Sequence, residues 1–305
     1  MVDPRDEIFN AVLYTLRYYT LFRYPLKAEE IYGNLPIKSS LSCILVALED
    51  LEKEEIIFNS DGYYSIDKQT KNWVLKRKEA NGLARKKTKQ ALWVGRFIYK
   101  FPFVRFVGIS GSLSKGYADA KSDFDFFIVT AENRLWICRT ILHLFKKMTF
   151  LAGQQNKFCM NYFIDINSLE IEEQNQFTAI ELSSLIPVSG HDISIKLKSD
   201  NEWVNNFLPN GYVGFSNEKR EINDNKNRTK NVFEFFLNYL FPTKLNELLM
   251  RLTDKKWRKK WEKKNYPMED YNVAFKTTLT VSKNHPSNHQ KRILNIISQH
   301  WQHTN

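Results

Sequence analysis

The sequence predicts an α+β protein in which a winged helix-turn-helix is followed by a small mixed sheet and a helical C-terminal region. Three observations predict this class. Apolar residues recur at helical spacing near the N-terminus and precede two short β signals, strand and helix patterns alternate from residue 102, and helical patterns prevail after residue 190. The predicted divisions are 1–70 for the winged helix-turn-helix, 71–101 for a basic connector helix, 102–190 for the core and 191–305 for the helical region.

The N-terminal pattern predicts three helices and a hairpin. Helices are expected over residues 6–22, 28–33 and from Ser39 or Ser40 to about residue 54, because serine is a favoured N-cap. Strands over 56–58 and 63–66 flank Asp61-Gly62, a dipeptide that supplies the positive φ angles of a tight turn. This order is typical of a winged helix-turn-helix.

The third predicted helix lacks the side chains expected of a DNA reader. A winged helix normally places this helix in the major groove, where it needs donors for phosphates and base edges. Acidic residues outnumber basic ones between Ile37 and Glu55, so the groove would repel this helix. The sequence therefore disfavours DNA as a partner and favours protein interaction or intramolecular packing.

Composition indicates a cytoplasmic protein with an anionic partner. The formal net charge is +11, and ten Lys or Arg lie between Lys71 and Lys100 against the single acid Glu79. A second basic cluster follows Lys255; such runs are usually solvated helix faces, and polyanion contact is the alternative. Three scattered cysteines predict no disulfide framework, and the absence of a long apolar run predicts neither a signal peptide nor a membrane partner.

A glycine turn follows the first strand of the predicted core. Residues 103–110 form an apolar strand pattern that continues directly into Gly111 and Ser112. Glycine lets the backbone approach a phosphate closely, and Ser112 adds a hydroxyl donor beside the free backbone N–H groups of a following helix. A Gly-Ser pair after a strand is also a common tight turn, so this signal needs support from elsewhere in the chain.

That support comes from Asp123 and Asp125, which open the next strand pattern, residues 123–129. Residues two apart on a strand point to the same side, so the two carboxylates lie next to each other and repel. A divalent cation would compensate them, and oxygen ligands suit Mg²⁺, or Mn²⁺ in its place. The sequence therefore predicts Asp123 and Asp125 as metal ligands.

These residues resemble the signature of the nucleotidyltransferase superfamily that includes DNA polymerase beta: Gly-Ser, about ten residues, then Asp-x-Asp. Ser112 and Asp123 are separated by ten residues here. The resemblance covers residues 102–190, and a winged helix in front occurs in some bacterial members. It implies that Gly111 and Ser112 bind the β- and γ-phosphates of a nucleoside triphosphate, with help from Lys115, and that the aspartates bind metal.

The resemblance also implies a third carboxylate on a third strand. Residues 134–151 predict a helix and residues 157–166 the strand, on which Asn161, Phe163 and Asp165 share one face by alternation. Asp165 is the expected third catalytic and metal-binding carboxylate, with Glu170 or Glu181 as alternatives. A solvent-facing aspartate at a strand end is an equally good interpretation of Asp165.

The expected activity is metal-dependent transfer of a nucleoside monophosphate, by default AMP from ATP, to a hydroxyl acceptor: RNA, protein or a small molecule. The alternative is an inactive nucleotidyltransferase-fold regulator or binding module that acts through its winged helix. In the C-terminal region, residues 232–250 predict a buried amphipathic helix that includes Phe233, Phe236, Leu237 and Leu240.

Overall fold

The computed structural model describes residues 4–150, 157–212 and 228–301. Its N-terminal unit contains three helices and a two-stranded antiparallel hairpin, in the predicted order: α1 (Pro4–Thr20), α2 (Ala28–Gly33), α3 (Leu41–Lys53), β1 (Phe58–Ser60) and β2 (Tyr63–Ser65). The Ser40 side chain accepts a hydrogen bond from the Cys43 amide and caps α3. Asp61 and Gly62 both have positive φ angles, 54° and 76°, so the predicted tight turn is confirmed.

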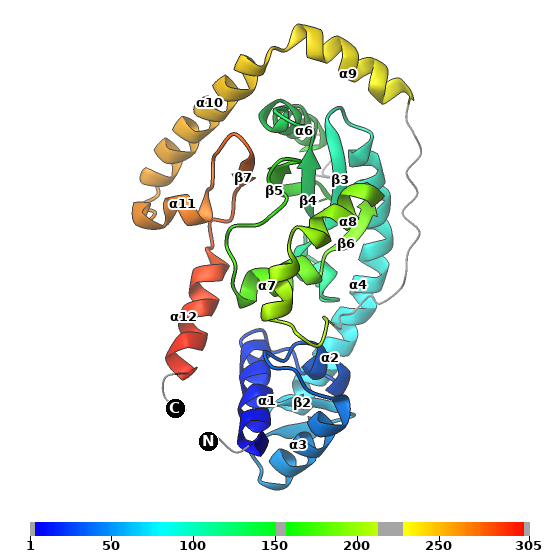
Figure 1. The fold of residues 1–305 in the computed structure, drawn as a ribbon, viewed down its shortest axis with the longest axis vertical. Helices are drawn as coiled ribbons and strands as arrows, with labels where there is room; N and C mark the ends of the chain where they lie inside the picture. Colours follow the sequence, from blue (N-terminus) through cyan, green and yellow to red (C-terminus); the bar gives the residue numbers. More distant parts are fainter. Residues whose placement is uncertain (1–3, 151–156, 213–227, 302–305) are drawn as a thin grey trace.

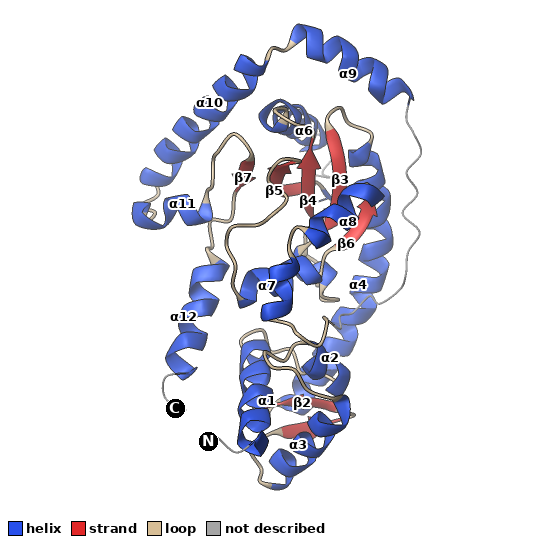
Figure 2. Cartoon of the chain, viewed as in Figure 1, coloured by secondary structure: helices blue, strands red, loops and turns tan. Residues whose placement is uncertain are grey.

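A five-stranded mixed sheet forms the centre of the molecule (Figure 2), and its strand order is β6-β3-β4-β5-β7. Neighbouring strands are antiparallel except for the parallel pair β4 and β5. The strands are β3 (Val104–Ile109), β4 (Asp125–Thr130), β5 (Cys159–Asp165), β6 (Ile186–Ser189) and β7 (Val281–Lys283). Because β3 ends where β4 and β5 begin, the glycine turn and the acidic strand entry meet at one end of the sheet.

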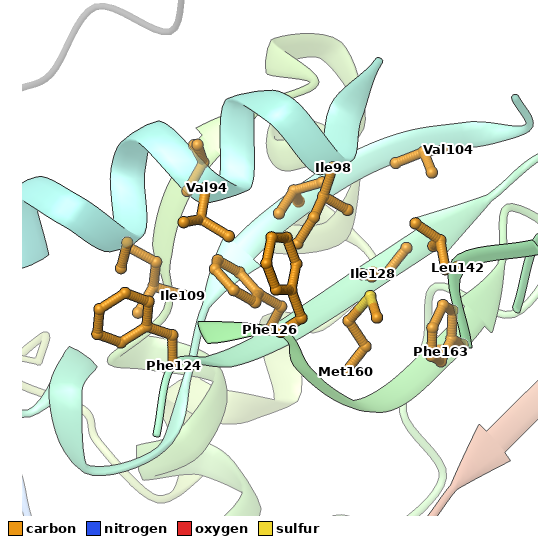
Figure 3. Close-up of a cluster of buried hydrophobic side chains, with 14 of the residues drawn as sticks. Val94, Ile98, Val104, Ile109, Phe124, Phe126, Ile128, Leu142, Met160 and Phe163 are labelled. Carbon is orange, nitrogen blue, oxygen red and sulfur yellow. The ribbon is translucent and has the colours of Figure 1, made fainter. Parts of the chain in front are cut away.

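Alternation along the strands divides the apolar side chains between two faces. Phe126 and Ile128 lie on the face covered by α4 (Thr70–Tyr99) and α6 (Leu135–Phe150), where Figure 3 shows them packed against Val94, Ile98 and Leu142. Phe127 and Val129 lie on the opposite face with Leu197 of α8 (His191–Ser199). By the same alternation, Asp125 lies on the face of Phe127 and Val129.

The sequence predicted a helical C-terminal region, but the structure adds a strand to it. β7 pairs with β5 and completes one edge of the sheet. A three-residue strand with one apolar buried residue, Val281, has no period that a sequence pattern can detect. The other described elements after residue 190 are helical: α8, η2 (Glu202–Asn206), α9 (Arg228–Leu240), α10 (Thr243–Glu262), η3 (Met268–Asp270), α11 (Tyr271–Ala274) and α12 (His289–Trp301).

The N-terminal unit and the core share a continuous apolar cluster. Ala179 and Ile180 of α7 (Gln176–Ser183) and Ile293 of α12 pack among the buried side chains of α1, α2 and α3. Asn210 also joins them, because its side chain donates to the carbonyl oxygens of Tyr32 and Ile37. The first seventy residues therefore do not pack as an isolated module.

Two enclosed histidines make folding stability depend on pH. Burial lowers the pKa of His143 to about 3 and that of His285 to about 4, from 6.5, with nearby positive charges adding to both effects. Between pH 6.5 and these values the unfolded chain binds more protons, so stability falls as the pH is lowered through 6.5. We expect each histidine to cost about 1–2 kcal/mol between pH 7 and pH 5.

Urea unfolding at both pH values measures this loss. The variants His143→Gln and His285→Gln should each flatten the pH dependence relative to the parent. Equal pH dependence in both variants and the parent would contradict the assignment.

Candidate functional site

Gly111 forms a turn that only glycine fits, at the end of β3. Its φ angle is +68°, and a Cβ atom built there would lie 2.6 Å from Oδ2 of Asp125. The backbone at Gly111 therefore lies directly against a carboxylate of the next strand. Ser112 is exposed and follows in α5 (Gly111–Ser114), a single turn that is too short for a developed helix dipole.

Asp125 is the first residue of β4 and is held beside this turn. The Ser110 amide donates a hydrogen bond of 2.9 Å to the Asp125 carbonyl oxygen, which fixes the two strands next to each other. Asp123 precedes the strand by two residues, is partly exposed, and acts electrostatically on the Asp125 carboxyl group. The structure thus brings together Gly111, Ser112, Asp123 and Asp125, as the sequence predicted.

A β-bulge in β5 directs Asn161 to the same place. Phe126 pairs with Met160 but Phe127 pairs with Tyr162, so Asn161 is the extra residue of the bulge. Its amide nitrogen lies 3.5 Å from Oδ1 of Asp125 and 3.0 Å from Sγ of Cys159. An amide and a thiol, rather than a further carboxylate, therefore flank Asp125 on the neighbouring strand.

The electrostatics of the site are dominated by acids. Burial raises the pKa of Asp125 above its ordinary value; a hydrogen bond from the Cys159 thiol opposes this rise, and the charges of Asp123 and Glu181 add to it. Lys115 is the cation that counteracts them, with its ammonium 2.8 Å from the Glu181 carboxylate and 3.1 Å from the Gly111 carbonyl oxygen. Three carboxylates thus face one ammonium group.

The segment between the turn and the acids is fastened to the rest of the protein. The Tyr24 hydroxyl donates to the carbonyl oxygen of Lys115 at 3.1 Å, and Asn81 of α4 donates to that of Gly116. Lys87 of α4 donates to the carbonyl oxygens of Ala120 and Ser122. Both the N-terminal unit and α4 therefore position the glycine turn and the entry into β4.

The structure does not bring Asp165 to this site, which corrects the expectation that it supplies the third carboxylate. Thr130, not Asp125, pairs with Asp165, so the two acids are separated by five residues along the sheet, about 17 Å. The bulge at Asn161 also breaks the alternation on which the shared face was based, because Phe163 packs on the α4 and α6 face. The buried Asp165 carboxylate instead accepts hydrogen bonds from the backbone N–H groups of Asn133 and Asn167.

We expect Asp165→Asn to lower stability and leave the site intact. Asparagine offers one acceptor oxygen to two backbone N–H groups, so one of them would face an NH₂ group instead. Burial raises the pKa of Asp165, and removing this carboxylate offsets part of the cost, so the net loss should be about 1 kcal/mol. Urea unfolding measures this loss, and calorimetry with a magnesium–nucleoside triphosphate should show unchanged affinity at a temperature where the variant is folded. Unchanged stability together with lost turnover would instead show that Asp165 takes part in the reaction.

Of the two alternatives, Glu181 faces the site and Glu170 does not. Glu170 is exposed and lies near Gln174, whereas Glu181 on α7 contacts Lys115 and influences Asp125. A sequence pattern does not locate Glu181, because its helix lies between the sheet and the N-terminal unit and reaches the site only through tertiary packing. The sequence indicated Glu181 only as an alternative third carboxylate and placed Asn161 on the face of Asp165 rather than beside Asp125. The contact of Tyr24 with Lys115 was missed, since a long-range contact has no local signal.

The donor set fits a divalent cation bound together with phosphate. Asp123 and Asp125 supply hard oxygen ligands, the site carries excess negative charge, and the absence of a side chain at Gly111 lets the backbone lie directly against the Asp125 carboxylate. Within the ranges that the structure describes, no three His, Cys, Asp or Glu side chains are grouped as a complete metal site. A cation here would take its remaining ligands from water or from a substrate.

The fold and the site define an α+β protein with a glycine turn and a carboxylate pair at one end of a mixed sheet. Comparison of the chain with models of protein families, with curated proteins and with solved structures finds no match. Among the described residues, no helix has both the length and the apolar character needed to cross a membrane.

Proposed function

We propose that this protein is a nucleotidyltransferase that moves a nucleoside monophosphate from a magnesium–nucleoside triphosphate, by default ATP, to a hydroxyl acceptor. One observation carries this proposal: Gly111 packs directly against Asp125, so a phosphate at the glycine turn lies next to the carboxylate pair. This contact fits the Gly-Ser and Asp-x-Asp resemblance. It is a second line of support, because the resemblance rests on spacing along the chain and the contact on proximity in space.

The residues of the site divide into two roles. The exposed Ser112 hydroxyl and the backbone N–H groups of the turn bind the β- and γ-phosphates, while Asp123 and Asp125 hold Mg²⁺ or Mn²⁺. The cation, when bound, neutralises charge that develops on the phosphate oxygens. Lys115 leaves Glu181 for the triphosphate, because a polyphosphate attracts an ammonium group more strongly than a single carboxylate does.

Glu181 is then the free base nearest the reacting groups. An acceptor hydroxyl forms a bond to the α-phosphorus, its proton passes to the Glu181 carboxylate, and the bond to the bridging oxygen breaks to release pyrophosphate. The Lys115–Glu181 ion pair therefore releases the base only when the triphosphate is in place.

A transfer assay tests this proposal. The full chain is incubated with each α-labelled nucleoside triphosphate, Mg²⁺ or Mn²⁺ and fractionated cell extract, and the RNA, protein and small-molecule fractions are then separated. We expect label in one fraction and release of pyrophosphate, both lost in Asp125→Asn. Failure of every triphosphate to bind or react would overturn the proposal.

A second candidate, a nucleotide-binding regulator without transferase activity, is favoured by Asn161. This amide occupies the position beside Asp125 on the third strand where the resemblance implies a carboxylate. In this case the same assay shows metal-dependent triphosphate binding without pyrophosphate release.

In this proposal the N-terminal unit is a winged helix-turn-helix that binds protein rather than DNA. The outward side of α3 exposes Leu45 and Val46 beside acidic residues such as Glu49, which neither phosphates nor base edges attract. The described cysteines, Cys43, Cys138 and Cys159, are unpaired, which fits a cytoplasmic protein.

A further inference from the structure

Helix α9 is amphipathic, but its charged side faces the protein. Lys230 is 8% exposed and donates hydrogen bonds to the carbonyl oxygens of Tyr99 and Val104 at 2.8 and 2.5 Å. Glu234 is 9% exposed, accepts a bond from the Phe103 amide at 2.6 Å and pairs with Arg105 at 2.7 Å. These contacts fix α9 on the ends of α4 and β3, at the junction between them.

The opposite side of α9 presents an apolar surface to solvent, which corrects the expectation of a buried helix. Tyr239 is 89% exposed and Phe235 is 73% exposed, whereas Leu237 faces the core. Six side chains follow one another at helical spacing over an arc of about 160°. We call this surface the apolar ridge: Val232, Phe233, Phe235, Phe236, Tyr239 and Leu240.

The helix cannot bury the apolar ridge by turning on its axis. Rotation would break the Glu234–Arg105 pair and the Lys230 hydrogen bonds, leaving partly buried charges without compensation. A contiguous aromatic surface of this kind marks an interaction site. We therefore expect another molecule, rather than the core of this protein, to cover the apolar ridge.

Positive charge gathers in a basic strip on the exposed side of α10, the helix that follows α9. Buried Asn246 and Trp257 mark the inner side of α10, and its outer side carries Lys244, Arg251, Lys255 and Lys259 at spacings of one helix face, with exposed Leu248 and Leu252 between them. Residues 243–264 contain nine Lys or Arg against three Asp or Glu. The covering surface is therefore expected to be apolar and anionic together.

We propose that α9 and α10 bind the surface of an anionic lipid bilayer, with the apolar ridge among the lipid headgroups and acyl chains and the basic strip against the headgroup charges. Figure 1 shows both helices on the outside of the molecule, where the inner side of α10 packs against α6. Exposed aromatic side chains beside lysines are the combination that interfacial helices use. Two copies packed ridge to ridge would bring two basic strips together, which disfavours a dimer.

This proposal concerns attachment to a membrane surface and not passage through it. It departs from the expectation that the protein has no membrane partner, which rested on the absence of a long apolar segment. It is independent of the proposed nucleotidyltransferase activity, because the apolar ridge and the basic strip contain none of the site residues.

Co-sedimentation of the full chain with lipid vesicles tests the proposal. Vesicles of phosphatidylcholine with phosphatidylserine should bind the protein at least about tenfold more tightly than phosphatidylcholine alone, and added salt should weaken this binding. The double variant Phe235→Ser/Tyr239→Ser should lose about tenfold or more, and Lys255→Gln/Lys259→Gln should lose the preference for anionic lipid. The matched control Leu45→Ser/Val46→Ser removes similarly exposed apolar side chains on α3 and should bind as the parent does.

Thermal unfolding followed by circular dichroism should be the same for all variants, because the substituted side chains are exposed. No binding by the parent, or equal binding by the ridge variant and the parent, overturns the proposal. Light scattering that finds a dimer for the parent and a monomer for Phe235→Ser/Tyr239→Ser also overturns it and assigns the apolar ridge to a second copy of the chain.

Discussion

Replacing Asp125 by asparagine is expected to abolish metal-dependent triphosphate binding without destabilising the protein. The amide removes one ligand charge beside Gly111, and changes to residues that merely orient a metal ligand already cost about 10–100-fold in metal affinity. We therefore expect triphosphate affinity to fall by at least about a hundredfold. Asp123→Asn should have an effect of the same kind.

The folding stability of Asp125→Asn should not fall with its triphosphate affinity. In the absence of a cation, burial and the charges of Asp123 and Glu181 raise the pKa of Asp125, so its ionised form is held at a cost. Asparagine has nearly the same shape and removes that cost. The urea midpoint at pH 7 should therefore be unchanged or higher for Asp125→Asn, which separates loss of a ligand from loss of folding.

Isothermal titration with magnesium–nucleoside triphosphates measures the binding, and Asp192→Asn at the exposed start of α8 is the matched control. The control should bind as the parent does. If Asp123→Asn and Asp125→Asn both retained the parent's affinity for every triphosphate that the parent binds, the metal site would lie elsewhere.

Replacing Gly111 by alanine is expected to damage both the fold and the site. The added Cβ would lie 2.6 Å from the Asp125 carboxylate oxygen and 3.3 Å from its Cβ and Cγ, so either the turn or the aspartate must move. A displacement of about 1 Å among reacting groups is enough to lower turnover by about a hundredfold. The φ angle of +68° adds about 1–2 kcal/mol of backbone strain.

Gly62→Ala separates these two effects. Gly62 has a φ angle of +76°, and a Cβ atom there would meet nothing within 4 Å, so this variant carries the strain without the clash. It should lose about 1–2 kcal/mol of unfolding free energy and keep its triphosphate affinity. Similar affinities for Gly111→Ala and Gly62→Ala would show that the close approach of Gly111 to Asp125 is not needed for binding.

Local patterns were sufficient to predict most of the secondary structure before residue 166 and the proximity of the glycine turn to the acidic strand entry. Helical periodicity predicted α1 and α3, the basic run predicted α4, and the order of elements that the resemblance implies predicted α6, each to within a few residues. The Gly-Ser and Asp-x-Asp resemblance implied that Gly111 and Asp125 act together, and the antiparallel pairing of the consecutive strands β3 and β4 brings them into contact. The residues of such consecutive elements are close together in the chain, so a sequence motif can indicate their contact.

The positions of Asp165 and of the aromatic side of α9 could not be predicted from local sequence, because they depend on which distant segments pack together. The position of Asp165 was predicted from strict alternation, which a one-residue bulge at Asn161 and the parallel pairing of β4 with β5 overrule. The inward side of α9 was predicted from hydrophobicity, but Arg105 and the carbonyl oxygens of Tyr99 and Val104 bind its charged side instead.

The sequence by itself determined the helices, the hairpin turn at Asp61-Gly62 and the Gly111, Ser112, Asp123 and Asp125 set, since each depends on residues close together in the chain. Tertiary structure alone decided that Glu181, and not Asp165, lies beside Lys115 and Asp125, that Tyr24 holds the backbone at Lys115, and that α9 presents its aromatic side outward. The physical reason is the same in each case. Electrostatic pairing and packing act between atoms close in space, and the chain separation of such atoms, 66 residues for Lys115 and Glu181, leaves no periodic pattern to follow.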